Sequence, residues 1–168
     1  MEKVKNVPFV DEVEVFNETF GKPNNYTPIV PNDKKLTDFV VNFIKEETDE
    51  LAEAIENKDI VEVLDAICDL LYVAVGNATM VFGLKDKLID AYAEVQASNM
   101  SKSCATEEEA EQTVQAHYRK QGPCYYKQVG DRWVVYRQAD DKVMKSINYF
   151  APNLHQFFTE EEIENAKQ

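Results

Sequence analysis

Glycine is scarce in this sequence, and its scarcity excludes one common way of holding phosphate groups. Only five glycines occur among the 168 residues, and they are scattered along the chain without forming a cluster. P-loop nucleotidases cradle phosphates with the backbone of a glycine-rich loop that also carries Lys and Ser or Thr. If this chain binds phosphate groups, it therefore does so with other residues.

Basic side chains, cysteine and long apolar runs are also limited. Eighteen Lys and Arg stand against 31 Asp and Glu, a net charge of -13, which argues against nucleic acid as a partner. The odd number of cysteines, without metal-ligand spacing, predicts free thiols in a reducing compartment. No uncharged run of 18 apolar residues occurs, and no signal-peptide pattern follows Met1. We therefore expect a cytoplasmic protein that does not contact a membrane.

Acidic side chains concentrate between Glu46 and Tyr72. This stretch predicts two helices joined by the polar turn 57–59, which together form an antiparallel helical hairpin. Residues equally far from the turn of such a hairpin lie at the same height. Three pairs of acids then meet at successive levels: Glu53 and Glu62, Glu50 and Asp65, and Glu46 and Asp69.

A stripe of acids on a helix usually forms a solvated face, but this does not explain two acidic positions of the stretch. Glu47 falls in the apolar arc of the first helix, and Asp69 has apolar neighbours on the second. A buried carboxylate is costly unless it is paired, protonated or bound to metal, and only Lys45 and Lys58 are close in sequence. We therefore predict a divalent cation. Ligands that are all oxygen favour Mg²⁺ first and Mn²⁺ second.

The same acids carry a resemblance to a known superfamily. The run Glu46-Glu47-x-x-Glu50, a polar turn, and a second acidic helix ending in Asp69-Leu70-Leu71-Tyr72 resemble the all-α nucleoside triphosphate pyrophosphohydrolases. This superfamily includes MazG and phosphoribosyl-ATP pyrophosphohydrolase. The segment Ser98-Asn99-Met100-Ser101-Lys102 is similar to the one that closes the catalytic helices in one branch. The resemblance extends from about Val15 to Lys102.

The resemblance implies roles for particular residues. The family pattern is E-x-x-D before Leu-Leu, but Ala66 stands three residues before Asp69, so either Asp65 or the pair Glu62 and Asp65 takes the first place. One or two metal ions are expected on Glu47, Glu50 and Asp69, with Asp65 or Glu62 completing the shell. Glu46 is expected to orient or deprotonate the attacking water. The expected substrate contacts are Asn99, Lys102, Asn24 and Tyr26.

The expected fold is mainly α, an all-α pyrophosphohydrolase-like helical bundle with a small C-terminal β-hairpin. We expect a single domain over residues 1–168, with a catalytic helical core at about 11–102 and a helix, hairpin and tail at 103–168. Periodicity predicts an apolar helix that ends before Gly83 and is buried nearly all round from Val63 to Val81, with Cys68 in the core. Strands are predicted at 125–129 and 132–137, with a possible third at 142–146.

The leading hypothesis is a Mg²⁺-dependent hydrolase that cleaves a nucleoside triphosphate between the α and β phosphates, giving monophosphate and pyrophosphate. One alternative is action on phosphoribosyl-ATP in histidine synthesis. Another is a non-enzymatic helical module that binds metal or a basic partner through its acids. Because one hairpin and two shorter helices can scarcely cover the apolar helix, and the resemblance agrees, we expect a homodimer or higher homo-oligomer.

Overall fold

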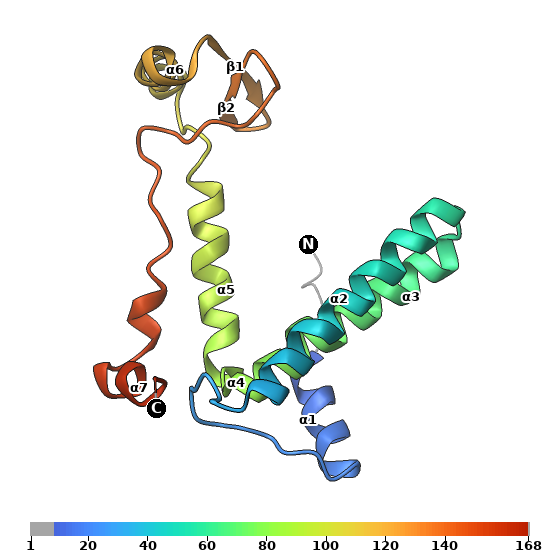
Figure 1. The fold of residues 1–168 in the computed structure, drawn as a ribbon. Helices are drawn as coiled ribbons and strands as arrows, with labels where there is room; N and C mark the ends of the chain where they lie inside the picture. The colour runs from blue at the N-terminus through green and yellow to red at the C-terminus, as the bar shows by residue number, and fades with distance from the viewer. Residues whose placement is uncertain (1–8, 168) are drawn as a thin grey trace. The chain divides into compact units, whose positions relative to one another are not determined.

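The computed structural model describes residues 9–167, and it confirms a mainly α fold with a small C-terminal hairpin (Figure 1). The signal-peptide prediction rests on residues outside this range. In chain order the elements are α1 (Phe9–Thr19), α2 (Lys34–Asn57), α3 (Ile60–Leu70), the π-helix η1 (Leu71–Asn77), α4 (Ala78–Phe82), α5 (Lys85–Met100), α6 (Glu107–Gln121), β1 (Cys124–Val129), β2 (Arg132–Arg137), the 3₁₀ helix η2 (Leu154–Phe157) and α7 (Glu160–Asn165).

The chain divides into two compact units. The first runs to Leu88 and takes in the chain again from Phe158 onward, whereas the second is Ile89–Phe157. The boundary thus lies inside α5, and not at residue 102, where the resemblance ends. The expectation that the whole chain acts as one domain stays a prediction. Within the described residues, no helix is both long enough and apolar enough to cross a bilayer.

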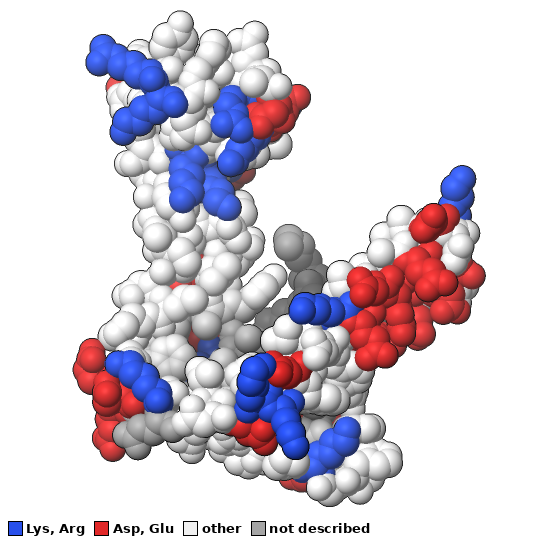
Figure 2. Space-filling view, viewed as in Figure 1, with Lys and Arg blue, Asp and Glu red and all other residues white. Residues whose placement is uncertain are grey.

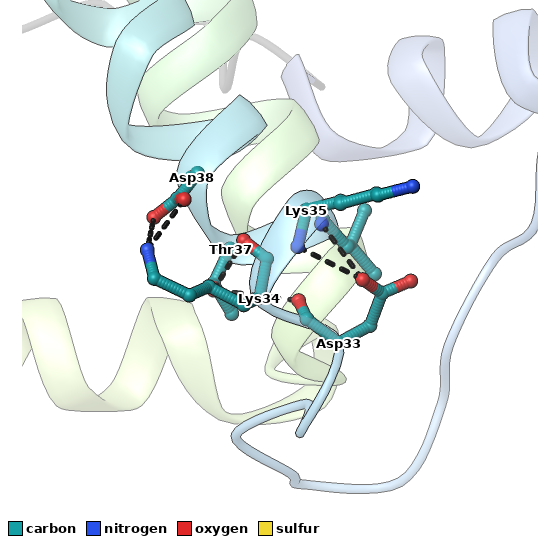
Figure 3. Close-up of polar contacts among 6 residues, drawn as sticks. Asp33, Lys34, Lys35, Thr37 and Asp38 are labelled. Carbon is teal, nitrogen blue, oxygen red and sulfur yellow. Dashed lines mark hydrogen bonds and ion pairs between the residues drawn. The ribbon is translucent and has the colours of Figure 1, made fainter.

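The predicted helical hairpin is formed by α2 and α3, which pack side by side. Asp33 caps the start of α2, since its Oδ1 accepts hydrogen bonds from the backbone N–H groups of Lys35 and Leu36 (Figure 3). Lys58 ends α2 in the left-handed conformation, with φ of 57°. Asp59 then caps α3 through its own side chain. Local capping therefore fixes the short turn and brings the two acidic helices together.

The helix that follows the turn ends at Gly83, as predicted, but it is not α-helical throughout. Residues Leu71–Asn77 form a π-helix, which the sequence pattern did not predict. Helix α1 packs against this segment. Gly76 permits the close approach, because a Cβ added there would lie 2.2 Å from Cγ2 of Val13. The π-helix therefore begins two residues after Asp69, and α1 packs against its side.

The prediction that this helix is buried nearly all round is wrong for the single chain. Leu64 is 63% exposed and Ile67 is 43% exposed, and Cys68 is also exposed and not in the core. The reason is geometric, since α2 covers only one face of α3. The chain therefore leaves an apolar face of α3 uncovered by the rest of its described residues.

The second unit is built on helix α6 and the two-stranded hairpin. The side chain of Thr106 caps α6 by accepting a hydrogen bond from the N–H of Glu109. Strands β1 and β2 pair in antiparallel register, with Tyr126 opposite Val135. The predicted third strand is reduced to an isolated bridge between Tyr136 and Val143. Met144, which follows Val143, belongs to the core of this unit. The other core residues are Cys104, Ala110 and Val135.

Gly83→Ala is predicted to destabilise the protein more than Gly21→Ala. Both glycines have positive φ, +66° and +65°, so alanine costs about 1–2 kcal/mol of backbone strain at either position. Only at Gly83 would the new Cβ also collide with backbone, lying 2.1 Å from the carbonyl oxygen of Thr27. We expect a further loss of about 1–3 kcal/mol there, measured by urea unfolding. Equal losses in the two variants would contradict this account.

Candidate active site

Three carboxylates from the two helices of the hairpin converge. One oxygen from each of Glu47, Glu50 and Asp69 lies within 4.8 Å of the other two. Glu47 and Glu50 are on successive turns of α2, whereas Asp69 comes from the end of α3. Glu47 is only 7% exposed, Asp69 is half-buried and Glu50 is open to solvent. Figure 2 shows acidic side chains gathered over the outer part of this hairpin.

The electrostatics of this cluster are unfavourable without a cation. Burial raises the pKa of Glu47, and the negative charges of Asp69, Glu50, Glu46 and Asp65 raise it further. Within residues 9–167, neither Lys45 nor Lys58 forms an ion pair with any of these acids. The hairpin therefore gathers negative charge around one buried carboxylate, and no lysine or arginine among the described residues forms an ion pair with it.

The donor set fits a hard divalent cation. All three converging groups offer carboxylate oxygens, which are the ligands that Mg²⁺ and Mn²⁺ prefer. Glu46 and Asp65 are exposed and influence Glu47 through their charge. Glu62 lies nearer the turn, where it shares a hollow of about 320 Å³ with Glu50 and other residues. The structure thus brings Glu47, Glu50 and Asp69 together, while the roles assigned to all six acids stay predictions.

An apolar cavity of about 340 Å³ begins one helical turn from these carboxylates. Phe43 precedes Glu47 by four residues on α2, and Tyr72 follows Asp69 by three residues at the start of η1. Residues at such spacing are neighbours on a helix surface. The cavity lining comes from α1, the loop after it, α2, η1 and α4: Val13, Phe16, Asn17, Lys22, Pro23, Leu36, Phe39, Phe43, Tyr72, Asn77 and Val81.

Aromatic rings form much of the cavity wall. The ring centroids of Phe39 and Phe43 are 5.4 Å apart, and those of Phe16 and Tyr72 meet edge to face at 5.7 Å. The ammonium of Lys22 lies 5.4 Å from the centroid of Phe16. A mostly apolar, concave wall with a few polar groups is typical of sites for small molecules. This cavity can accept a flat, partly apolar group such as a nucleobase.

Two of the predicted substrate contacts, Asn24 and Tyr26, hold the loop after α1 in place. Asn24 Oδ1 accepts a hydrogen bond of 2.8 Å from Nδ2 of Asn17, which itself lines the cavity. The hydroxyl of Tyr26 donates to Oε1 of Glu14 at 2.7 Å. Neither Asn24 nor Tyr26 is part of the cavity lining. Their observed contacts support the loop, and direct contact with substrate stays a prediction.

The other two predicted substrate contacts, Asn99 and Lys102, belong to the second unit. They contact each other, because Nζ of Lys102 donates a hydrogen bond of 2.8 Å to Oδ1 of Asn99. Their contact with a substrate also stays a prediction.

Sequence reasoning did not select Asn17, Lys22 or Asn77, which are polar groups of the cavity. They come from α1, the following loop and η1, so no single motif contains them. Tyr72 did belong to the motif that carries the resemblance, but its place in a cavity depends on how α1 packs. The acids were easier to find because their spacing along two helices is regular.

Comparison with known proteins shows the family of the chain. The family model for phosphoribosyl-ATP pyrophosphohydrolase matches residues 13–99, which is more than half of the chain. The chain belongs to this family. A 37% identical relative over 86 residues is an uncharacterized protein of Acanthamoeba polyphaga mimivirus, and the match covers 49% of this chain. The same match covers 33% of the mimivirus protein, so the chain spans about a third of that relative.

The family model is named for a pyrophosphohydrolase, an enzyme that acts on phosphoric anhydride bonds. The matched span contains α1 from Val13 onward, the α2–α3 hairpin, the π-helix, α4 and most of α5. It therefore contains the converging carboxylates and the whole lining of the apolar cavity.

Glu47→Gln is predicted to stabilise the metal-free protein at neutral pH. The pKa of Glu47 is raised in the folded chain above its ordinary value of 4.5, so the folded state binds this proton more readily than the unfolded state. The favourable contribution is present below the ordinary pKa and is lost as pH rises through the raised pKa. Urea unfolding in EDTA at pH 7 should show the variant to be more stable than the wild type, by a margin that shrinks toward pH 4.

Glu56→Gln is the matched control, because Glu56 is an exposed acid on the same helix and does not appear among the charges that raise the pKa of Glu47. It should leave the stability nearly unchanged. If the Glu47→Gln protein is no more stable than the wild type at pH 7, the buried charge of Glu47 does not destabilise the folded state.

Proposed function

We propose that this protein hydrolyses a nucleoside triphosphate between the α and β phosphates, releasing nucleoside monophosphate and pyrophosphate. The observation that carries this proposal is the convergence of three carboxylates, those of Glu47, Glu50 and Asp69, beside an apolar cavity. Glu47 is buried, and no basic side chain of the described residues pairs with it. Membership of a pyrophosphohydrolase family supports the class of bond that is cleaved. The scarcity of glycine agrees, since a P-loop mechanism at the γ phosphate is excluded.

In this proposal Glu47, Glu50 and Asp69 would hold Mg²⁺, with Mn²⁺ as the second choice. When bound, the ion supplies positive charge to the phosphate oxygens as negative charge develops on them. Asp65 or Glu62 adds a further carboxylate oxygen on the side of α3. Glu46 lies next to the cluster and is exposed, so it can hold a water molecule and accept a proton from it.

The apolar cavity sets the direction of the substrate. Because the cavity begins one turn beyond the carboxylates on both helices, a nucleoside bound there leaves its phosphate groups next to the acids. The α phosphate is the one nearest the nucleoside and so reaches the cluster first. This arrangement favours cleavage at the α phosphorus over removal of the terminal phosphate.

The family model supports a second candidate substrate, phosphoribosyl-ATP, because the description of that model names it. This compound also carries a triphosphate that is cleaved between its α and β phosphates. A panel of ribo- and deoxynucleoside triphosphates that includes phosphoribosyl-ATP distinguishes the two, since the preferred substrate should show the highest kcat/KM.

Hydrolysis in ¹⁸O-labelled water with Mg²⁺ is predicted to place the label in the nucleoside monophosphate. Water attacks the α phosphorus in this mechanism, so the pyrophosphate leaves without gaining an oxygen from the solvent. Mass spectrometry of both products checks the prediction. Production of nucleoside diphosphate with labelled orthophosphate would rule out the mechanism.

The carboxylates are tested in the same assay. Glu47→Gln and Asp69→Asn should each lower kcat/KM by about 100-fold or more. Removing a residue that only supports a metal ligand costs about 10–100-fold, and removing the ligand itself should cost more. Glu56→Gln on the same helix should retain wild-type turnover. If the wild type hydrolyses none of the triphosphates, a non-enzymatic metal-binding module is favoured instead.

We also propose that the protein assembles as a homodimer or a higher homo-oligomer through α3. Ile60 and Val61 are 76% and 69% exposed, and Leu64 continues the same apolar surface one turn later. Exposed apolar residues grouped in this way are typical of contact surfaces between proteins. A second copy of the hairpin would cover them in an arrangement of four helices.

Leu64→Asp is predicted to convert the oligomer to monomer, because a charge in an apolar interface loses its hydration without gaining a partner. Light scattering at micromolar concentration should show the drop in mass. Val129→Asp is the control, since Val129 is an exposed apolar residue of β1 in the other unit and should not change the mass. A wild-type protein that is already a monomer under these conditions would contradict the proposal.

A further inference from the structure

The second unit has a charge balance very different from that of the rest of the chain. Residues 89–157 contain eight Lys and Arg against nine Asp and Glu, a net charge of -1. The remaining residues therefore carry -12 of the total of -13. Figure 2 shows Lys and Arg side chains gathered over the part of the molecule that contains α6 and the β-hairpin. The difference comes from the acids, because the rest of the chain holds 22 Asp and Glu against ten Lys and Arg.

Part of this positive charge lines a cavity of about 490 Å³ that lies entirely within the second unit. Lys102 comes from the turn after α5, His117 and Gln121 from successive turns of α6, and Lys142 and Lys145 from the segment after β2. Among the described residues that line it, there is no Asp or Glu. The three lysines and the amide of Gln121 can donate hydrogen bonds, so the lining suits an anion.

Backbone contacts fix the relative positions of the three lysines. The carbonyl of Lys102 accepts a hydrogen bond of 3.1 Å from the N–H of Ser146. The carbonyl of Lys145 lies 2.7 Å from Nε2 of His117, and because a carbonyl can only accept, this nitrogen carries the proton. Buried Met144 anchors the segment between Lys142 and Lys145. The cluster is therefore built by tertiary structure and is not a run of adjacent lysines.

The positive charge of the cluster is not cancelled locally. Within the described part of the chain, none of the three lysines forms an ion pair with a carboxylate. The nearby Asp140 is already held by a two-point contact with Arg137. A hydrogen bond with Ser98 lowers the pKa of Tyr149, and the charges of Lys145 and Lys102 lower it further. The charges of two of the three lysines thus act on the same neighbouring hydroxyl.

We propose that this cavity, which we call the lysine pocket, binds a phosphate-containing anion with at least two linked phosphoryl groups. Three lysines and the side-chain amide of Gln121 can contact several oxygens at once, which a diphosphate supplies and a monophosphate supplies less well. The anion is either free pyrophosphate or the polyphosphate of a nucleotide. This proposal does not require that the acidic cluster be catalytic.

The test titrates pyrophosphate into the full-length wild-type protein by calorimetry in EDTA, so that no divalent metal bridges the anion to the acidic helices. Saturable binding that weakens with added salt is expected. Lys142→Gln and Lys145→Gln should each weaken it about tenfold, because each removes a charged hydrogen bond. Lys120→Gln should change affinity by less than about twofold, since Lys120 is an exposed lysine of α6 outside the pocket.

A second arm identifies the source of the anion by titrating an α,β-methylene nucleoside triphosphate and a nucleoside monophosphate. Loss of triphosphate affinity in Lys145→Gln assigns the pocket to the nucleotide, whereas an effect on pyrophosphate alone assigns it to the free anion. Either result supports the pocket. No saturation by either ligand up to about 10 mM, or equal weakening by Lys120→Gln, overturns it.

The result is separable from the proposed function. A chain that hydrolyses triphosphates but binds no pyrophosphate or methylene analogue in EDTA keeps the proposed function and loses the lysine pocket. A chain that binds pyrophosphate through Lys142 and Lys145 but hydrolyses no triphosphate keeps the pocket and loses the proposed function.

Discussion

Repulsion among carboxylates around Glu47 is the constraint on which the functional part of this structure depends. Glu47 is buried, and Asp69 and Glu50 lie beside it with no cation from the described chain. Such an arrangement persists only if other interactions hold the two helices together. The caps at Asp33 and Asp59 and the packing of α2 on α3 provide this restraint. The folded chain thereby maintains a strongly negative site.

The apolar cavity and the acidic cluster are neighbours because α2 contributes to both and η1, which lines the cavity, continues directly from α3. Moving along α2 from Glu47 to Phe43, or past the end of α3 from Asp69 to Tyr72, changes the surface from charged to aromatic within one turn. A ligand with an apolar end and a multiply charged end matches this change. Nucleotides have this character, which is why the geometry and the family membership support the same proposal.

Much of the site follows from sequence because helical periodicity is local. The spacing of Glu46, Glu47 and Glu50, the polar turn and the stop at Gly83 each depend on a few adjacent residues. The cavity and the lysine pocket do not. His117 and Lys145 are 28 residues apart and meet only after α6 and the hairpin have packed. The exposed face of α3 could not be predicted from the sequence either. Apolar residues indicate that a surface is buried, but they do not indicate which element or partner covers it.

The π-helix also preserves a phase relation along the chain. A π-helical turn accommodates one residue more than an α-helical turn, so each of its residues advances the side chains by less than the roughly 100° of an α-helix. Deleting one residue from Leu71–Asn77 to restore a regular α-helix would therefore change the direction of Asp69 relative to Met80 and Phe82 only a little. Their carbonyls accept hydrogen bonds from Asn25 and Ile29 of the loop after α1. The extra residue is thus absorbed within the π-helix, in the segment against which α1 packs, and the carboxylate keeps its direction relative to the loop that borders the cavity.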